Sequence, residues 1–205
     1  MRYDPEKHHR RSIRLKGYDY TSPGGYFITL VAQGRVCLFG EITKGEMQYS
    51  ERGQIAYEYW LAIPDHFHNA ELGAFVIMPN HMHGIIILKE SLDASRRRDI
   101  IYPAPRTGTT CRAPTGAPTD APTGRAAMEQ FQKPVVGSIP TIIRIYKAAV
   151  TRKIVAQFGG MPDLWQRNYY EHIIRNDDEH KRIHLYIESN PLHWISDEEN
   201  PEMKS

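Results

Sequence analysis

The sequence is poor in cysteine, lacks a long hydrophobic run and carries no strong excess of either charge. Its 205 residues hold only two cysteines, Cys37 and Cys111, far apart along the chain. We therefore expect neither a disulfide framework nor a cysteine-based zinc site. No signal region is recognisable and no apolar run approaches membrane length, which predicts a cytoplasmic protein without a membrane partner. The net charge of +2 neither requires nor excludes nucleic acid as a partner.

One region contains a tandem repeat without core-forming residues. Residues 91–133 are rich in arginine, proline, threonine and glycine, and they include the tandem repeat "APTGAPTDAPTG". This composition cannot bury enough apolar surface to offset the entropy of ordering, so it predicts a disordered insertion or a flexible linker. The length of the chain predicts a single domain over residues 1–205, interrupted by this insertion at about 91–133.

The first half of the chain alternates between strand and helix patterns. A β-branched and aromatic run at 24–33 follows a Pro-Gly-Gly turn and predicts a strand, and "CLFGEI" is either a second short strand or a turn back. Ser50 is a candidate N-cap for a helix. Two apolar runs within 71–88 flank Pro79 and Asn80, which predicts a β-hairpin with these residues in its turn.

The second half continues the alternation. Residues 138–160 show helical spacing of apolar residues and end in two glycines, and 164–175 should form another strand. Asn176 and Glu179 form the pattern of a capping box at the start of a last helix, which ends at Pro191. The order strand, helix, hairpin, helix, strand, helix predicts an α+β fold, with a ferredoxin-like antiparallel sheet and helices packed on it.

Two histidines stand where the second strand of the hairpin begins. In "VIMPNHMHGIIIL", His81 and His83 are separated by one residue. Strand side chains alternate between faces, so both imidazoles should point the same way. They could hold one metal ion, or they could be plain surface residues at a hairpin tip. His172 and His184 have no second ligand at useful spacing, and we expect them to be surface or DNA-contacting residues.

The last helix offers two further groups. Tyr186 and Asn190 are four residues apart, so they should share a helix face. The amide oxygen of Asn190 suits a hard ion such as Mg²⁺, although the following Pro191 should push Asn190 away from helical geometry. A phenol with a reference pKa of about 10 is a useful nucleophile only when a cation stabilises its anion. Spacing alone also allows Tyr186 to be a buried core residue with one hydrogen-bond partner.

Basic and aromatic side chains are candidates for contacts with nucleic acid. The basic N-terminal stretch around Arg14 is either a phosphate-binding arm or a solvated terminus. A stripe on the helix at 138–160 is either a solvated face or a phosphate-binding one. The candidate phosphate contacts beyond the terminus are Arg144, Lys147, Arg152 and Arg167, and the candidate base-stacking rings are Trp165 and Tyr169.

Three segments together resemble a known family. "MPNHMHGIIIL", "LWQRNYYEHIIRN" and "YIESNP" are similar to the motifs of HUH single-tyrosine transposases, in the branch associated with repetitive extragenic palindromes (REPs). The resemblance covers roughly residues 10–90 and 135–195. It implies a ferredoxin-like fold, metal ligation by His81 and His83 with Asn190 as the third ligand, and Tyr186 as the nucleophile of a "Y-x-x-x-N-P" segment. The insertion departs from the compact family pattern and could alter DNA contacts.

The resemblance also implies a function. Such transposases cleave single-stranded DNA beside imperfect hairpins and leave a 5′-phosphotyrosine and a free 3′-hydroxyl. We therefore expect an endonuclease and strand transferase that uses Mg²⁺ or Mn²⁺ on hairpin-forming DNA, as a monomer or homodimer near the nucleoid of a prokaryotic cell. One alternative is a hairpin-binding protein that does not cleave. Another is a metal-dependent hydrolase that acts through water and forms no protein–DNA adduct.

Overall fold

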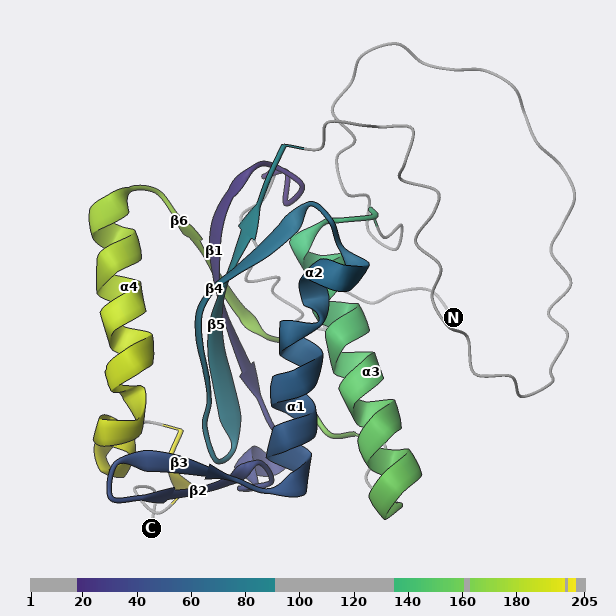
Figure 1. Cartoon of the computed structure of the whole chain (residues 1–205), viewed down its shortest axis with the longest axis vertical. Coiled ribbons are helices and arrows are strands. Elements are labelled where there is room, and N and C mark those ends of the chain that lie inside the picture. Colours follow the sequence, from purple (N-terminus) through teal and green to yellow (C-terminus); the bar gives the residue numbers. More distant parts are fainter. Residues whose placement is uncertain (1–17, 91–134, 161–162, 198, 202–205) are drawn as a thin grey trace, which may run out of the picture.

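The computed structural model describes residues 18–90, 135–160, 163–197 and 199–201 (Figure 1). Arg14 and the predicted insertion at about 91–133 lie outside the described residues. Among the residues described, no helix combines the length and the apolar character needed to cross a bilayer.

The main sheet confirms the predicted ferredoxin-like arrangement. Its strand order is β4-β5-β1-β6, and each neighbouring pair is antiparallel. Along the chain, helix α1 follows β1 and helix α3 follows the β4-β5 hairpin, as the sequence pattern predicted. The bounds are β1 (Gly24–Val31), α1 (Glu51–Leu61), β4 (Ala70–Ile77), β5 (His81–Leu88), α3 (Ile139–Phe158) and β6 (Tyr170–Ile174).

Helices cover both faces of this sheet. Helices α1 and α3 lie on one face, together with the short α2 (Ile63–His66), and α4 (Asp177–Ser189) lies on the other (Figure 1). The larger apolar core fills the α1/α3 side and includes Trp60 and Tyr146. The smaller core, on the α4 side, is built around Phe27, Ile85 and Ile187.

The segment after β1 holds two elements outside the main sheet. The short 3-10 helix η1 (Gln33–Arg35) is followed by a separate hairpin of β2 (Gly40–Thr43) and β3 (Glu46–Tyr49). The sequence left a short strand or a turn open here, and the structure shows a strand. The two residues between β2 and β3, Lys44 and Gly45, have φ angles of 55° and 79°, which suit a tight two-residue hairpin turn.

Side-chain caps fix the starts of the helices. Ser50 accepts a hydrogen bond from the backbone nitrogen of Gly53 at the start of α1. At the start of α4, Asn176 accepts from the nitrogen of Glu179, and the Glu179 carboxylate reaches back to the nitrogen of Arg175 at 2.8 Å. These bonds satisfy donors that a helix start otherwise leaves unpaired. The capping box predicted for the last helix is therefore present, with its carboxylate bonded one residue before the cap.

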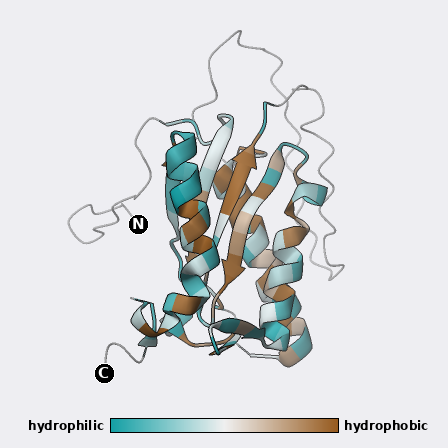
Figure 2. Ribbon diagram, turned by 60° about the vertical axis from the view of Figure 1, so that its left-hand side comes forward, coloured by the Kyte–Doolittle hydropathy of each residue, from teal (hydrophilic) through white to brown (hydrophobic). Residues whose placement is uncertain are grey.

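Strand β5 runs through the centre of the molecule. Both of its faces are covered, so it forms a nearly continuous apolar stretch, coloured brown in Figure 2. Its even-numbered side chains Met82 and Ile86 join the α1/α3 core, and Ile85 joins the α4 core. A Cβ atom on Gly84 would lie 2.5 Å from the Trp60 ring, so glycine is what lets this indole pack against the strand.

Candidate active site

The alternation of β5 directs His81 and His83 to the face covered by α4. Both rings are almost fully buried, with 0 % and 5 % of their surface exposed. Their centroids are 4.7 Å apart, and the rings meet edge to face. The two histidines are thus neither scattered nor exposed at a hairpin tip. They form one buried pair.

A neighbouring side chain occupies the Nδ1 atom of each ring. His81 Nδ1 lies 2.9 Å from the Oδ1 atom of Asn80, and His83 Nδ1 lies 2.8 Å from the hydroxyl of Thr29. Thr29 stands directly opposite His83 in the β1–β5 register. Outer partners of this kind orient the histidine ligands of metal sites and leave Nε2 for the metal.

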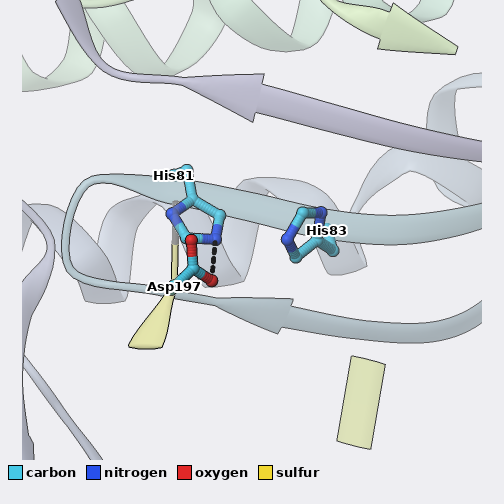
Figure 3. Close-up of side chains that lie close together, drawn as sticks. All are labelled: His81, His83 and Asp197. Atoms are coloured by element: carbon cyan, nitrogen blue, oxygen red, sulfur yellow. Dashed lines mark ion pairs between the residues drawn. The ribbon is translucent and has the colours of Figure 1, made fainter. Parts of the chain in front are cut away.

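Both Nε2 atoms face a common space that an acidic side chain also reaches. His81, His83 and Asp197 offer ligand atoms that all lie within 4.8 Å of one another, and they form such a cluster within the described part of the chain (Figure 3). The Asp197 carboxylate is 3.9 Å from His81 Nε2. Two imidazoles and a carboxylate are suitable donors for a divalent ion.

Burial keeps both imidazoles neutral. The pKa of His81 is lowered from 6.5 to about 4, mainly by burial, although the charge of Glu199 and the Asn190 amide raise it and the charge of Arg35 lowers it further. The pKa of His83 is lowered well below its usual range by burial and by the neighbouring His81. A neutral imidazole keeps the lone pair that a metal ion needs. The contact between His81 and Asp197 is accordingly not an ion pair at neutral pH.

The lowered pKa of His81 predicts that the metal-free protein loses stability in acid. Between pH 6.5 and pH 4 the unfolded chain binds a proton at His81 and the native protein does not, so the free energy of unfolding falls as the pH falls. The loss attributable to His81 is about 3 kcal/mol across this range, and His83 acts in the same direction. Urea unfolding at several pH values, with a chelator present, measures it.

The control for this pH dependence is a pair of substitutions. His81→Gln removes the buried titrating group and should flatten the pH dependence of unfolding. His68→Gln changes an exposed histidine and should keep the wild-type slope. Equal slopes in the wild type and in His81→Gln would contradict the assignment.

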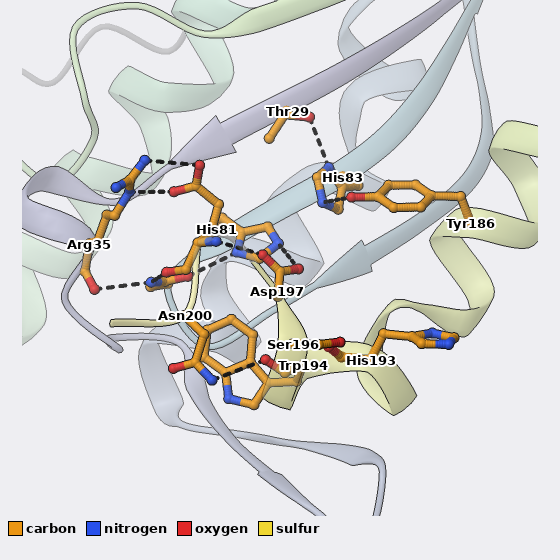
Figure 4. Close-up of polar contacts among 12 residues, drawn as sticks. Thr29, Arg35, His81, His83, Tyr186, His193, Trp194, Ser196, Asp197 and Asn200 are labelled. Carbon is orange, nitrogen blue, oxygen red and sulfur yellow. Dashed lines mark hydrogen bonds and ion pairs between the residues drawn. The ribbon is translucent and has the colours of Figure 1, made fainter. Parts of the chain in front are cut away.

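Helix α4 carries Tyr186 to the same place. Its hydroxyl lies 3.2 Å from His83 Nε2 (Figure 4). The phenol ring packs edge-on against His83 and Phe27, with centroid distances of 5.2 Å and 6.1 Å. The side chain is nevertheless 47 % exposed, so a large substrate can reach it. The alternative of a buried core tyrosine therefore does not apply.

Asn190 lies one helical turn beyond Tyr186. It is 3 % exposed, and its Oδ1 atom is buried without a hydrogen-bond partner, as is His81 Nε2. The expectation that Pro191 displaces Asn190 from helical geometry is wrong, because the residue has φ −56° and ψ −42°. The proline sits in the first turn of the following 3-10 helix η3 (Asn190–Ser196), where its missing N–H costs nothing.

The segment after η3 closes the site, and its role is not visible in the sequence. Arg35 pairs with Glu199 at 3.1 Å, Asn80 donates to the Glu199 carbonyl, and Asn200 donates to the Trp194 carbonyl (Figure 4). These contacts bring Asp197 to the histidines. Sequence reasoning missed Asp197 because it follows a short irregular helix with no periodic pattern. It missed Thr29 because the match with His83 exists only across two paired strands.

The candidate DNA contacts on α3 lie away from Tyr186. Arg144 and Arg152 are exposed on α3, which covers the opposite face of the sheet from α4. Lys147 donates to the carbonyls of Gln166 and Arg167, and burial lowers its pKa to about 8. Through these hydrogen bonds, Lys147 connects α3 to the segment before β6.

The aromatic candidates are also placed differently from the expectation. Trp165 is 7 % exposed and packs on Phe39 with centroids 5.0 Å apart. Tyr169 is half-buried against the α1/α3 core, and Arg167 is exposed. Trp165 was expected to stack on unpaired bases. The structure instead packs it in the core, because its bridge to Ala32 turns the ring inward.

The sequence and the fold were compared with those of known proteins. No family model matches the chain. An uncharacterized protein of Haemophilus influenzae is 38 % identical over 200 residues, which cover 96 % of each chain. A solved structure of a REP-associated tyrosine transposase bound to a REP hairpin aligns with a TM-score of 0.51, with 18 % identity, and covers 89 % of this chain and 73 % of that one. The chain therefore belongs to the family of the Haemophilus influenzae protein, and its fold is similar to that of the REP-associated tyrosine transposase.

Proposed function

We propose that this protein is a metal-dependent endonuclease and strand transferase, a transposase that acts on single-stranded DNA at hairpin-forming repeats. The observation that carries the proposal is the meeting of the Tyr186 hydroxyl and His83 Nε2 at 3.2 Å, within a buried histidine pair. A phenol that is half-exposed on one side and placed beside metal-binding nitrogens on the other suits nucleophilic attack on a bulky phosphodiester.

The residues present fit a divalent ion. His81 Nε2 and Asn190 Oδ1 are buried, and neither makes a well-aligned hydrogen bond, although the Asn190 amide lies close enough to raise the pKa of His81. Buried polar atoms of this kind are costly unless a cation or donor satisfies them. We propose that these two atoms, His83 Nε2 and the Asp197 carboxylate hold Mg²⁺ or Mn²⁺. When bound, this ion polarises a non-bridging phosphate oxygen and stabilises a phenolate. The mixed nitrogen and oxygen donors suit either ion.

The proposed step exchanges one phosphate ester for another. The Tyr186 oxygen forms a bond to phosphorus, and the bond from phosphorus to the 3′-oxygen of the neighbouring nucleotide breaks. The phenolic proton goes to solvent, which reaches the half-exposed side chain, and the departing 3′-oxygen takes a proton from water. The 5′-phosphotyrosine retains the energy of the broken phosphodiester, so a 3′-hydroxyl can reverse the reaction and join strands without ATP.

The proposed substrate is single-stranded DNA with a palindromic hairpin. The similar solved transposase was bound to a REP hairpin, and we propose a hairpin of the same general class here. DNA that reaches Tyr186 lies on the α4 side. Arg144, Arg152 and Arg167 remain proposed phosphate contacts only for DNA that extends around the sheet, since two of them lie on α3.

The proposed site is assembled by one chain. Tyr186, the histidine pair, Asn190 and Asp197 meet within a single copy of the protein, so we propose that a monomer can cleave. The proposed substrate also implies a cytoplasmic location, where bacterial DNA resides.

The test is a denaturing gel with single-stranded hairpin oligonucleotides labelled at the 3′ end. With Mn²⁺ or Mg²⁺ the full-length protein should produce a labelled band that migrates with the protein, because the tyrosine is joined to the 5′ end of the labelled 3′ fragment. A native gel shift without cleavage on the denaturing gel would favour a hairpin-binding protein. Cleavage that never yields a protein-linked band would favour a hydrolase that acts through water, and either result would overturn the proposal.

A further inference from the structure

Asn80 is a fully buried polar residue at the turn between β4 and β5, with no part of its surface exposed. Its side chain makes three hydrogen bonds. The Nδ2 atom donates to the carbonyl of Arg35 at 3.0 Å and to the carbonyl of Glu199 at 2.7 Å, and the Oδ1 atom lies 2.9 Å from His81 Nδ1 (Figure 4). Both amide hydrogens and the amide oxygen are therefore used.

These partners fix which way the amide points. The carbonyl oxygens of Arg35 and Glu199 can only accept, so the group that faces them must be the NH₂. A flipped amide would set its oxygen against both carbonyls and leave buried acceptors unpaired, at a cost of about 1–3 kcal/mol for each group. Oδ1 must then face His81, and because Oδ1 can only accept, the hydrogen of this contact must be on His81 Nδ1.

A neutral imidazole carries one hydrogen, so a hydrogen on Nδ1 leaves the lone pair on Nε2. The Nε2 atom of His81 lies 3.9 Å from the Asp197 carboxylate and near the Asn190 amide, and it makes no well-aligned hydrogen bond with either group. We propose that Asn80 is a positioning residue that holds His81 in the Nδ1–H tautomer, so that the Nε2 lone pair is directed at the metal site. This inference rests on the proposed metal-dependent function.

Asn80 also links the two sides of that site. The same NH₂ group that orients the amide holds the Glu199 carbonyl, and the Glu199 nitrogen donates to the Asp197 carboxylate at 2.7 Å. One side chain therefore sets the hydrogen position on His81 and anchors the segment that supplies Asp197. Thr29, beside His83, differs in kind. A hydroxyl can donate or accept, so Thr29 allows either tautomer of its histidine.

The first experiment measures the tautomer directly. Long-range ¹H–¹⁵N correlation spectra of metal-free protein labelled in histidine distinguish the two tautomers, and His81→Gln assigns the His81 signals. The wild type should show His81 only as Nδ1–H. Asn80→Ala should convert it to a mixture or to Nε2–H, whereas Thr29→Val should leave it unchanged. A wild-type His81 in the Nε2–H form would overturn the inference, whatever the Asn80 and Thr29 variants show.

The second experiment measures Mn²⁺ affinity by calorimetry. Loss of an outer partner of a metal ligand typically weakens binding about 10- to 100-fold, and we expect this range for Asn80→Ala. Wild-type affinity in Asn80→Ala would refute the positioning role. A wild type with the Nδ1–H tautomer that binds no Mn²⁺ would instead overturn the proposed function.

Discussion

Replacing Tyr186 by phenylalanine should abolish the covalent protein–DNA adduct while hairpin binding stays close to wild type. The substitution removes one oxygen and keeps the ring that packs on His83 and Phe27. Without the nucleophile we expect cleavage to fall by at least about 10³-fold. Denaturing gels measure the adduct, and a native gel shift with the same oligonucleotide measures binding.

Tyr170→Phe is the matched control for this prediction. Tyr170 is also exposed, at 52 %, and its ring also packs against Phe27, with centroids 6.2 Å apart. It should form adducts at the wild-type rate. Adducts that persist in Tyr186→Phe and disappear in Tyr170→Phe would move the nucleophile to β6.

Replacing His83 or His81 by alanine should remove metal-dependent cleavage. The buried pair supplies both nitrogen donors of the proposed site. Because loss of an outer partner alone costs about 10- to 100-fold, loss of a ligand should weaken Mn²⁺ binding by more than about 100-fold. Calorimetric titration with Mn²⁺ and single-turnover cleavage measure the two effects. His68→Ala, an exposed histidine between α2 and β4, should behave as the wild type.

The same Mn²⁺ titration tests the two proposed oxygen ligands, Asn190 and Asp197, one at a time. Asn190→Ala removes the buried Oδ1 atom, whereas Asn190→Asp keeps an oxygen at the same place. If Asn190 is a ligand, the aspartate variant retains Mn²⁺ binding and the alanine variant loses it. Asp197→Ala tests the carboxylate that completes the cluster. Wild-type Mn²⁺ affinity in both His81→Ala and His83→Ala would remove the metal site from the proposal.

The fold was largely predictable because its signals are local. Ser50 and Asn176 cap helices through bonds within three residues, and the β4-β5 hairpin follows from two apolar runs around a turn. The sheet order followed from the element order. Strand β6 is shorter than the predicted 164–175 run, because Trp165 pairs only with Ala32, just beyond β1, through an isolated bridge and turns into the core. An aromatic residue such as Trp165 fits a strand pattern whether or not its backbone pairs with a neighbouring strand, so the sequence does not show where β6 begins.

The site was predictable only where its residues share an element. Strand alternation predicted that the two histidines point the same way, and helical spacing predicted that Tyr186 and Asn190 share a face. Their roles as ligands and nucleophile were implied only by the family resemblance. Asp197 depends on a chain of tertiary contacts through Arg35, Glu199 and Asn80. No local pattern encodes those contacts. The basic stripe on α3 is a second example. Helical spacing predicted which residues share one face of the helix, but it did not predict that α3 covers the sheet face opposite α4.

The unequal cores on the two faces of the sheet have a mechanical consequence. Helix α4 rests on a small apolar cluster around Phe27, Ile85 and Ile187, whereas α1 and α3 enclose most of the buried apolar residues in the described chain. In the proposed reaction, DNA joined to Tyr186 would pull on α4, which rests on the smaller core. We expect such a pull to displace α4 before it disturbs the core between α1, α3 and the sheet.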